Sequence, residues 1–178
     1  MNVPFLLLSG PPGVGKTTAS WQIFDQLVEE GERPALVDLD LLGASWPVPD
    51  DDPHNERLKA RNLGAMWQNF YASGVRCLIA AGVVETRENL DLLRDAVPGA
   101  VTALCRLRAG DHELAARISG RGRERGDGAA KLAHRARQLS AQMEAHDVAD
   151  LVVDTDNHSI AEVARLVRSG ADWPGRIL

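Results

Sequence analysis

Short apolar segments alternate with amphipathic segments along the whole chain. The apolar segments have the length expected of buried strands, and we predict strands at residues 3–8, 34–39, 75–81, 101–107 and 151–153. Apolar residues at helical spacing predict helices between them, at residues 17–30, 55–72, 88–96 and 111–118, then around 132–143 and up to 170. Strands that alternate with helices in this way imply a parallel sheet covered on both faces.

Local signals predict how several of these helices begin and which face they bury. Ser159 and Glu162 have the spacing of a capping box for the last helix. Asp111 is expected to cap the helix that follows it. In the first helix, the large apolar residues are expected to face the core: Trp21, Phe24, Leu27 and Val28.

The bulk composition narrows the class of protein. A chain of 178 residues suits one domain over residues 1–178, and a net charge of −5 does not favour a nucleic-acid or membrane partner. The first apolar segment is too short for a signal sequence or a membrane span. Cys77 and Cys105 lie in apolar stretches, as buried free thiols do in a reducing compartment. We therefore expect a cytoplasmic protein, and no feature predicts its oligomeric state.

A phosphate-binding loop follows the first predicted strand. The segment matches the Walker A pattern G-x-x-x-x-G-K-[ST] without a gap: Gly10, Pro11, Pro12, Gly13, Val14, Gly15, Lys16 and Thr17. Glycines let backbone N–H groups close around phosphates, and the helix that follows presents the positive end of its dipole. Lys16 is expected to reach the β- and γ-phosphates of ATP and Thr17 to ligate Mg²⁺, with Thr18 beside them.

Two carboxylates follow the second predicted strand. Asp38 and Asp40 stand at the carboxyl end of that strand, the edge at which open parallel sheets bind ligands. If the strand continues through both residues, their side chains share a direction. One carboxylate is then placed to hold Mg²⁺ through water and the other to accept a proton from an attacking hydroxyl.

Arginines and glycines are concentrated between residues 117 and 128. Arg117 and Arg121 open this segment, and Arg123 and Arg125 follow. Arginines neutralise the charge that spreads over a transferred phosphoryl group, and glycines allow a loop to close over a nucleotide. The segment contains no aromatic residue on which a nucleic-acid base would stack.

These motifs resemble those of the P-loop small-molecule kinases of the nucleoside monophosphate kinase-like group, among them gluconate kinase, shikimate kinase, adenylylsulfate kinase and chloramphenicol phosphotransferase. The resemblance implies a three-layer P-loop fold with a five-stranded parallel sheet and a short arginine-rich lid at about residues 117–128. It also implies that Asp38 serves the metal and Asp40 the acceptor hydroxyl, with the exchange of these roles left open. Arg117 and Arg121 are expected to contact the nucleotide, one at the base and one at the phosphates.

The same resemblance suggests where the two substrates lie. The loop after the fifth strand borders the adenine in these kinases, so Asn157 is a candidate nucleotide contact. The acceptor is expected between the second and third strands, where Arg57, Arg61 and Trp67 are candidates. The two arginines are equally consistent with a surface network that pairs with residues 50–52.

The function expected from the sequence is ATP- and Mg²⁺-dependent transfer of a phosphoryl group to a hydroxyl of a small molecule, such as a sugar-like compound or an antibiotic. A nucleoside or nucleoside monophosphate kinase is one alternative. A nucleotide-binding regulatory protein without turnover is another.

Overall fold

The computed structural model describes residues 2–122 and 126–175. Its elements in chain order are β1 (Val3–Ser9), α1 (Lys16–Glu29), β2 (Pro34–Asp38), α2 (Leu39–Leu42), α3 (Glu56–Ala72), β3 (Cys77–Ala81), α4 (Arg87–Asp95), β4 (Ala100–Arg108), α5 (Asp111–Gly120), α6 (Gly128–His146), β5 (Leu151–Asp154) and α7 (Ile160–Gly170). The five strands form one sheet in the order β2-β3-β1-β4-β5, and every pair of neighbours is parallel.

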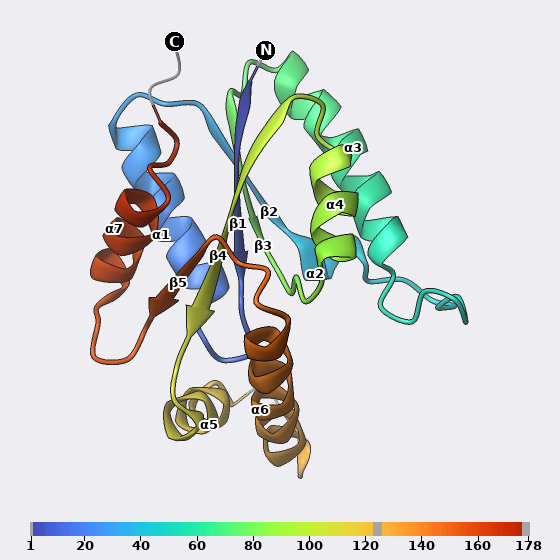
Figure 1. The fold of residues 1–178 in the computed structure, drawn as a ribbon, viewed down its shortest axis with the longest axis vertical. Helices are drawn as coiled ribbons and strands as arrows, with labels where there is room; N and C mark the ends of the chain where they lie inside the picture. The colour runs from blue at the N-terminus through green and yellow to red at the C-terminus, as the bar shows by residue number, and fades with distance from the viewer. Residues whose placement is uncertain (1, 123–125, 176–178) are drawn as a thin grey trace.

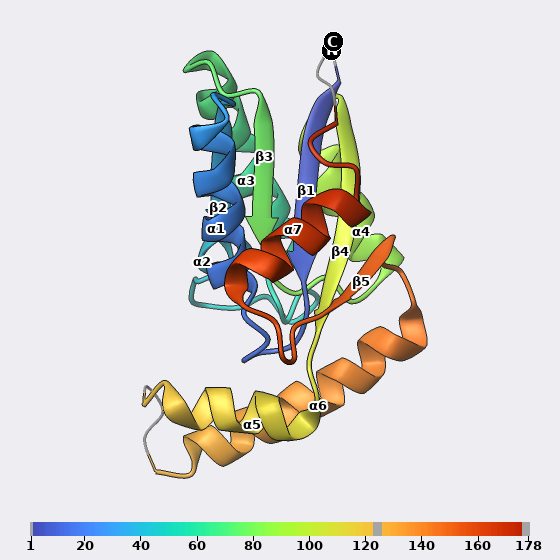
Figure 2. The same cartoon turned by 90° about the vertical axis from the view of Figure 1, so that its left-hand side faces the viewer.

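Helices cover both faces of the sheet, as the alternation of strands and helices predicts. Helices α1 and α7 lie on one face and α3 and α4 on the other, while α5 and α6 lie side by side beyond the carboxyl ends of the strands (Figures 1 and 2). The central strand β1 is buried along its whole length because it has a strand on each side and helices on each face. The predicted α/β fold with a five-stranded parallel sheet is therefore confirmed.

The buried face of α1 agrees with the prediction at Leu27 and Phe24, which lie in or against the core, and differs at Trp21 and Val28. Ala19, Ile23 and Leu27 are buried, whereas Trp21 is 53% exposed and Val28 51% exposed. The stripe at positions i, i+4 and i+8 meets the sheet, and Trp21 lies off that stripe, with its ring edge-on to Phe24 at 5.5 Å. The size of an apolar side chain was therefore a poorer guide to the buried face than its position.

Other helix ends differ slightly from the prediction. Asp111 is the first residue of α5 rather than its cap, and Gly110 occupies the cap position without a side-chain bond. The capping box of Ser159 and Glu162 is confirmed, since the Ser159 hydroxyl accepts from the Glu162 backbone N–H and the Glu162 carboxylate accepts from the Ser159 N–H. The predicted strand at residues 34–39 ends at Asp38, where the short helix α2 begins.

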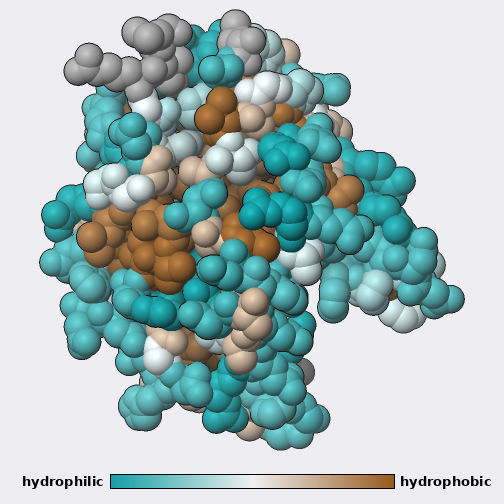
Figure 3. Space-filling view, in the orientation of Figure 1, coloured by the Kyte–Doolittle hydropathy of each residue, from teal (hydrophilic) through white to brown (hydrophobic). Residues whose placement is uncertain are grey.

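Two further features of the fold are an exposed apolar surface near α7 and a pair of buried cysteines. Ile160 and Leu166 of α7 remain exposed, and apolar surface gathers on the side of the molecule where Figure 1 places α7 (Figure 3). Both cysteines are buried free thiols, and burial raises the pKa of each to about 12. Within the described part of the chain, no helix is long and apolar enough to cross a bilayer.

Candidate nucleotide and phosphoryl-transfer site

The loop between β1 and α1 has the backbone that its glycines predict. Gly10, Gly13 and Gly15 all have positive φ, at 145°, 86° and 99°. A Cβ on Gly10 would lie 2.6 Å from the Leu107 carbonyl oxygen, so the loop passes close to the end of β4. Gly15 is the left-handed residue that precedes the first turn of α1. The loop thus presents backbone N–H groups and a helix N-terminus at one place, a cradle that suits phosphate.

Lys16 is the first residue of α1 and turns its ammonium group back into this loop. Its Nζ donates to the carbonyl oxygens of Gly10 at 2.7 Å and Pro11 at 3.2 Å. Burial lowers the pKa of Lys16 from 10.5 to about 8; the carboxylate of Asp40 opposes that shift, the Arg121 charge adds to it, and the Asp38 carboxylate also opposes it. Asp38, Asp40 and Arg121 are therefore close enough to Lys16, at the carboxyl edge of the sheet, for their charges to affect its pKa.

Asp38 and Asp40 lie on different elements, and the condition for a shared direction along a strand is not met. Asp38 is the last residue of β2 and caps α2, because its Oδ1 accepts from the backbone N–H groups of Asp40 at 2.9 Å and Leu41 at 3.4 Å. Asp40 lies in the first turn of α2 and is exposed. The two carboxylates are thus held differently, one by backbone bonds and the other by the placement of α2.

A pocket of about 450 Å³ opens beside the phosphate-binding loop. Its apolar lining comes from Val14 of the loop, Ala19 in the first turn of α1, and Ile160 and Val163 of α7. Arg117 and Arg121 also line it. The volume and the mostly apolar lining are those of a small-molecule site. A base placed in this pocket would have its phosphates next to the glycine loop.

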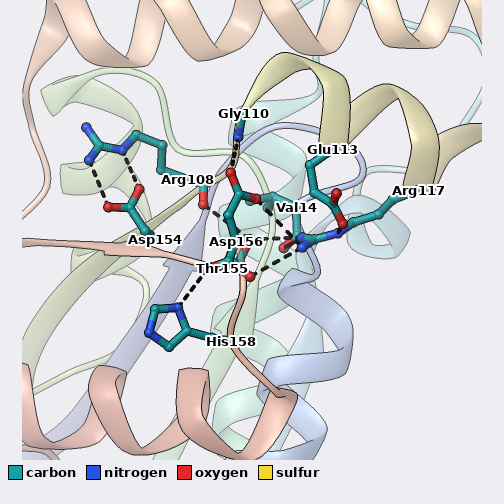
Figure 4. A network of polar contacts seen from close by, with 9 residues as sticks. All are labelled: Val14, Arg108, Gly110, Glu113, Arg117, Asp154, Thr155, Asp156 and His158. Atoms are coloured by element: carbon teal, nitrogen blue, oxygen red, sulfur yellow. Dashed lines mark hydrogen bonds and ion pairs between the residues drawn. The ribbon is translucent and has the colours of Figure 1, made fainter.

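Arg117 joins three elements around this pocket, as Figure 4 shows. Its Nε donates to Glu113 one turn earlier in α5 at 2.8 Å, and its Nη1 donates to the Thr155 hydroxyl at 2.9 Å and the Val14 carbonyl at 3.4 Å. Its Nη2 donates to the Thr155 carbonyl at 3.3 Å and lies 3.8 Å from Asp156 Oδ1. The donors of the guanidinium are therefore directed at the protein, whereas Arg121 is exposed at the end of α5.

The loop after β5 is itself held in place by β4. Asp154 and Arg108 form a two-bond ion pair at 2.7 and 2.9 Å, which holds the pKa of the Asp154 carboxyl below its usual value. Asp156 Oδ2 accepts from the Gly110 N–H at 2.7 Å. Thr155 and His158 from this loop line the pocket. The predicted contact Asn157 is exposed in a left-handed turn between them and is not among the lining residues.

The residues predicted for the acceptor are not gathered at the site. Trp67 is buried in the core, and it borders Val3 and Gly99 at the amino ends of β1 and β4, opposite the phosphate-binding loop. Its place in the core does not fit a contact with the acceptor. Arg57 pairs with Asp51 at 2.7 Å and lies 3.8 Å from Asp52, which agrees with the surface-network alternative.

Arg61 is exposed one helical turn after Arg57 and borders the groove between α3 and α4, together with Leu92 and Ala96. It therefore lies on the side of α3 that faces α4. Of the other lid arginines, Arg123 and Arg125 fall outside the described residues.

Sequence reasoning missed several residues that shape the site. Glu113 was detectable in principle, since it stands four residues before Arg117 in one helix. The contacts of Arg117 with Thr155 and Asp156 could not be predicted, because these residues are 38 or more positions away from it in the sequence. The segment after β3 is held by Ser9, whose hydroxyl accepts from the Val84 N–H at 2.8 Å, and nothing local in the sequence predicts that bond.

Comparisons with known proteins place the fold. No family model matches the chain. Two curated proteins match in part: the cytosolic Fe–S cluster assembly factor NUBP2 homologue of Trichoplax adhaerens is 33% identical over 36% of this chain, and that of Culex quinquefasciatus is 50% identical over 24%. The matches cover only 31% and 16% of those relatives' own lengths.

Solved structures match along nearly the whole chain. A gluconokinase from Sinorhizobium meliloti is 20% identical, covers 97% of this chain and 94% of its own, and has a TM-score of 0.63. The tunicamycin resistance protein of Deinococcus radiodurans (16%, 94% and 95%, TM-score 0.62) and a shikimate kinase from Acinetobacter baumannii (17%, 93% and 90%, TM-score 0.59) are also similar. At these identities the likeness shows the fold, and the predicted resemblance to P-loop small-molecule kinases is confirmed at that level.

The pKa of Lys16 gives a test of the phosphate-binding loop. ATP with Mg²⁺ is expected to raise the melting temperature of the protein by mass action, and Lys16→Ala is expected to remove most of that rise. Because the folded pKa is about 8, the ammonium is charged below pH 8 and loses its proton above it. The affinity for ATP, measured by calorimetry, is therefore expected to fall as the pH rises through 8 in the parent protein.

Lys131→Ala is the matched control, since Lys131 is an exposed lysine of α6 that pairs with Asp127. It is expected to keep both the ATP-induced rise and the pH dependence. An ATP response in Lys16→Ala equal to that of the parent would contradict the assignment of the loop.

Proposed function

We propose that the protein is a phosphotransferase that moves the γ-phosphoryl group of ATP to a hydroxyl of a small molecule. The observation that carries this proposal is the set of charged groups around the glycine loop: the Lys16 ammonium turns into the loop, Arg121 lines the pocket beside it, and the carboxylates of Asp38 and Asp40 are close enough to Lys16 to affect its pKa. A site that only binds nucleotide needs the loop and Lys16. The carboxylates and the exposed arginine suit the further task of transfer.

The residues present fit ATP with Mg²⁺. The glycine loop has room for an anion at Gly15, where a Cβ would meet nothing within 4 Å. Thr17 and Asp38 offer hydroxyl and carboxylate oxygens, the hard donors that Mg²⁺ takes. The cap of α2 uses Oδ1 of Asp38, so its Oδ2 is the oxygen that we assign to a metal-bound water. When bound, ATP would supply the phosphoryl group and Mg²⁺ would neutralise charge on its oxygens.

Asp40 is the residue that we assign to the acceptor. It is exposed, it lies in the first turn of α2, and it is the first of the neighbouring charges that act on Lys16. A carboxylate next to the γ-phosphate position can accept the proton of an attacking hydroxyl and orient its oxygen toward phosphorus. Lys16 would donate to the phosphates and so reduce the negative charge that this carboxylate faces.

The two lid arginines divide the work between the base and the phosphates. Since the donors of Arg117 are directed at Glu113, Thr155 and Val14, its remaining free surface is the flat face of the guanidinium, which suits stacking on a base. Arg121 is exposed and its charge reaches Lys16. We therefore assign Arg117 to the base side of the pocket and Arg121 to the phosphoryl group.

Two other functions are weaker candidates. The names of the curated relatives suggest Fe–S cluster assembly, but a cluster needs thiolate ligands, and burial raises the pKa of both cysteines to about 12. A nucleoside monophosphate acceptor would need a cation for its phosphate, and Arg57 is already paired with Asp51. A regulatory nucleotide-binding protein would keep the loop and show no transfer.

The proposal is tested by transfer of label. Protein, Mg²⁺ and γ-labelled ATP are mixed with a panel of sugars, polyols, antibiotics, nucleosides and nucleoside monophosphates, and label in the acceptor is measured. Transfer to a non-phosphorylated alcohol supports the proposal. Strong stabilisation by ATP without transfer to any member would favour the regulatory alternative.

Asp40 and Asp38 are expected to respond differently to the same substitution. Asp40→Asn removes the base and keeps the shape, so turnover is expected to fall roughly 10²–10⁴-fold at unchanged ATP affinity. Asp38→Asn keeps the cap of α2, because asparagine also caps helices, and is expected to raise the Mg²⁺ concentration needed for half-maximal turnover. A Mg²⁺ series on both variants separates the two roles, and an exchange of the two outcomes would mean that the roles are exchanged.

Substitutions of the two lid arginines are expected to differ in effect: one lowers stability and the affinity for ATP, and the other lowers the rate of turnover. Arg117→Ala removes bonds to three elements, so it is expected to cost about 1–2 kcal/mol, roughly 2–8 °C in melting temperature, and to raise the KM for ATP. Arg121→Ala is expected to leave the melting temperature unchanged and to lower kcat roughly 10²-fold. Arg137→Ala, an exposed arginine of α6, is the control. Equal effects of Arg117→Ala and Arg121→Ala on kcat and melting temperature would contradict the assignment of Arg117 to the base and Arg121 to the phosphoryl group.

A further inference from the structure

The helix that carries Asp40 is too short to hold its own position. Helix α2 has four residues, and a single turn is unstable without contacts from outside. Its first residue, Leu39, is fully buried, and a Cβ on Gly82 would lie 2.6 Å from the Leu39 Cβ. The close approach of the segment after β3 therefore fixes the beginning of α2.

The end of α2 is fixed by side chains of α3 and its cap. The Asn62 amide donates to the Leu42 carbonyl at 2.8 Å, and the Asn55 amide donates to the Gly43 carbonyl at 2.9 Å. The stem of Lys59 crosses Gly43 so closely that a Cβ there would lie 2.7 Å from Cε. Lys59 is buried, and its ammonium is bound by Glu56 at 2.8 Å.

Asn62 is the contact that couples α3 to α2 most directly. Its amide is directed at α2, whereas the neighbouring Arg61 borders the groove between α3 and α4. Leu42 is the last residue of α2, two positions after Asp40 and in the same turn. A bond that holds the Leu42 carbonyl thus also limits the rotation of the turn that carries Asp40. Asn55 acts on the next carbonyl, but it also begins α3 with a φ of 54°.

We propose that Asn62 is a positioning residue for Asp40: its amide ties the last carbonyl of α2 to α3 and so holds the Asp40 carboxylate in place for phosphoryl transfer. The inference rests on the proposed function, because it gives Asp40 a role in that step. Asn62 itself does not touch the reacting atoms. Its effect is transmitted through the backbone of one helical turn.

The experiment measures Mg–ATP turnover with water as the acceptor, by release of labelled phosphate. Asn62→Ala and Asn62→Leu both remove the amide, and the second keeps the volume of the side chain. Each is expected to lower kcat roughly 10- to 100-fold, because small displacements of a reacting group cost rates of this order. The KM for Mg–ATP is expected to stay within about twofold, since the nucleotide contacts lie on other elements.

Asn69→Ala, at an exposed position of the same helix, is the control and is expected to match the parent. Unfolding curves of all variants are recorded. A loss of kcat in Asn62→Leu at an unchanged melting temperature supports positioning. Parental kcat in both Asn62 variants would overturn the inference.

Combination with Asp40→Asn separates positioning from general support of the fold. If Asn62 acts through Asp40, Asn62→Ala is expected to cause no further slowing in the Asp40→Asn background. Equal slowing in the two backgrounds would overturn the inference and leave the proposed function intact. Parental turnover in Asp40→Asn alone would instead overturn the role assigned to Asp40, and the inference with it, whereas the proposed function fails only if no label is transferred to an acceptor.

Discussion

The ammonium of Lys16 is a positive charge held inside a backbone loop, and the rest of the site is arranged around it. A charge removed from water must be matched by polar groups, and here the first match comes from the carbonyl oxygens of Gly10 and Pro11. Those two bonds do not offset the effect of burial, and the pKa of Lys16 stays below its usual value. The nearby carboxylates favour the charged form of Lys16, and the phosphates of a nucleotide would favour it further. The charge of Lys16 is therefore fully compensated only when a nucleotide is bound.

The features of the site that could be predicted from the sequence are those that surround Lys16 in the chain or at the carboxyl edge of the sheet. The glycine loop and its lysine are contiguous, and their roles follow from backbone geometry at Gly10, Gly13 and Gly15. The sheet was predictable because a parallel strand buried on both faces has a nearly continuous apolar sequence, as β1 shows. The carboxyl edge of the sheet then brings the loop and Asp38 together, whatever the details of the helices.

The features that were not predictable depend on contacts between distant segments. Trp21 and Trp67 are both tryptophans in amphipathic helices, yet one is exposed and the other is core, because the sheet meets only one stripe of each helix. Arg117 and Arg121 belong to one motif in the sequence. What separates them is Thr155, which is 38 residues from Arg117 and accepts from it at 2.9 Å. The spacing of the arginines within the lid therefore could not predict which of them contacts Thr155.

The proposed nucleotide and acceptor sides of the site are held by different kinds of contact, and this difference bears on how an acceptor would be chosen. On the nucleotide side, Arg108, Asp154, Thr155 and Arg117 form a linked set of charged and neutral hydrogen bonds between β4, β5 and α5. On the acceptor side, α2 depends on neutral amide bonds from Asn55 and Asn62 and on the close packing of Gly43 and Gly82. Within residues 43–55, Gly43 and Asn55 hold α2, and Asp52 caps α3 by accepting from the backbone N–H groups of Glu56 and Arg57. Residues 46–51 take part in neither the bonds of α2 nor those of the nucleotide half, so they can change without disturbing either. For the proposed transferase, we expect changes in residues 46–51 to alter the choice of acceptor while Lys16 and its loop stay as they are.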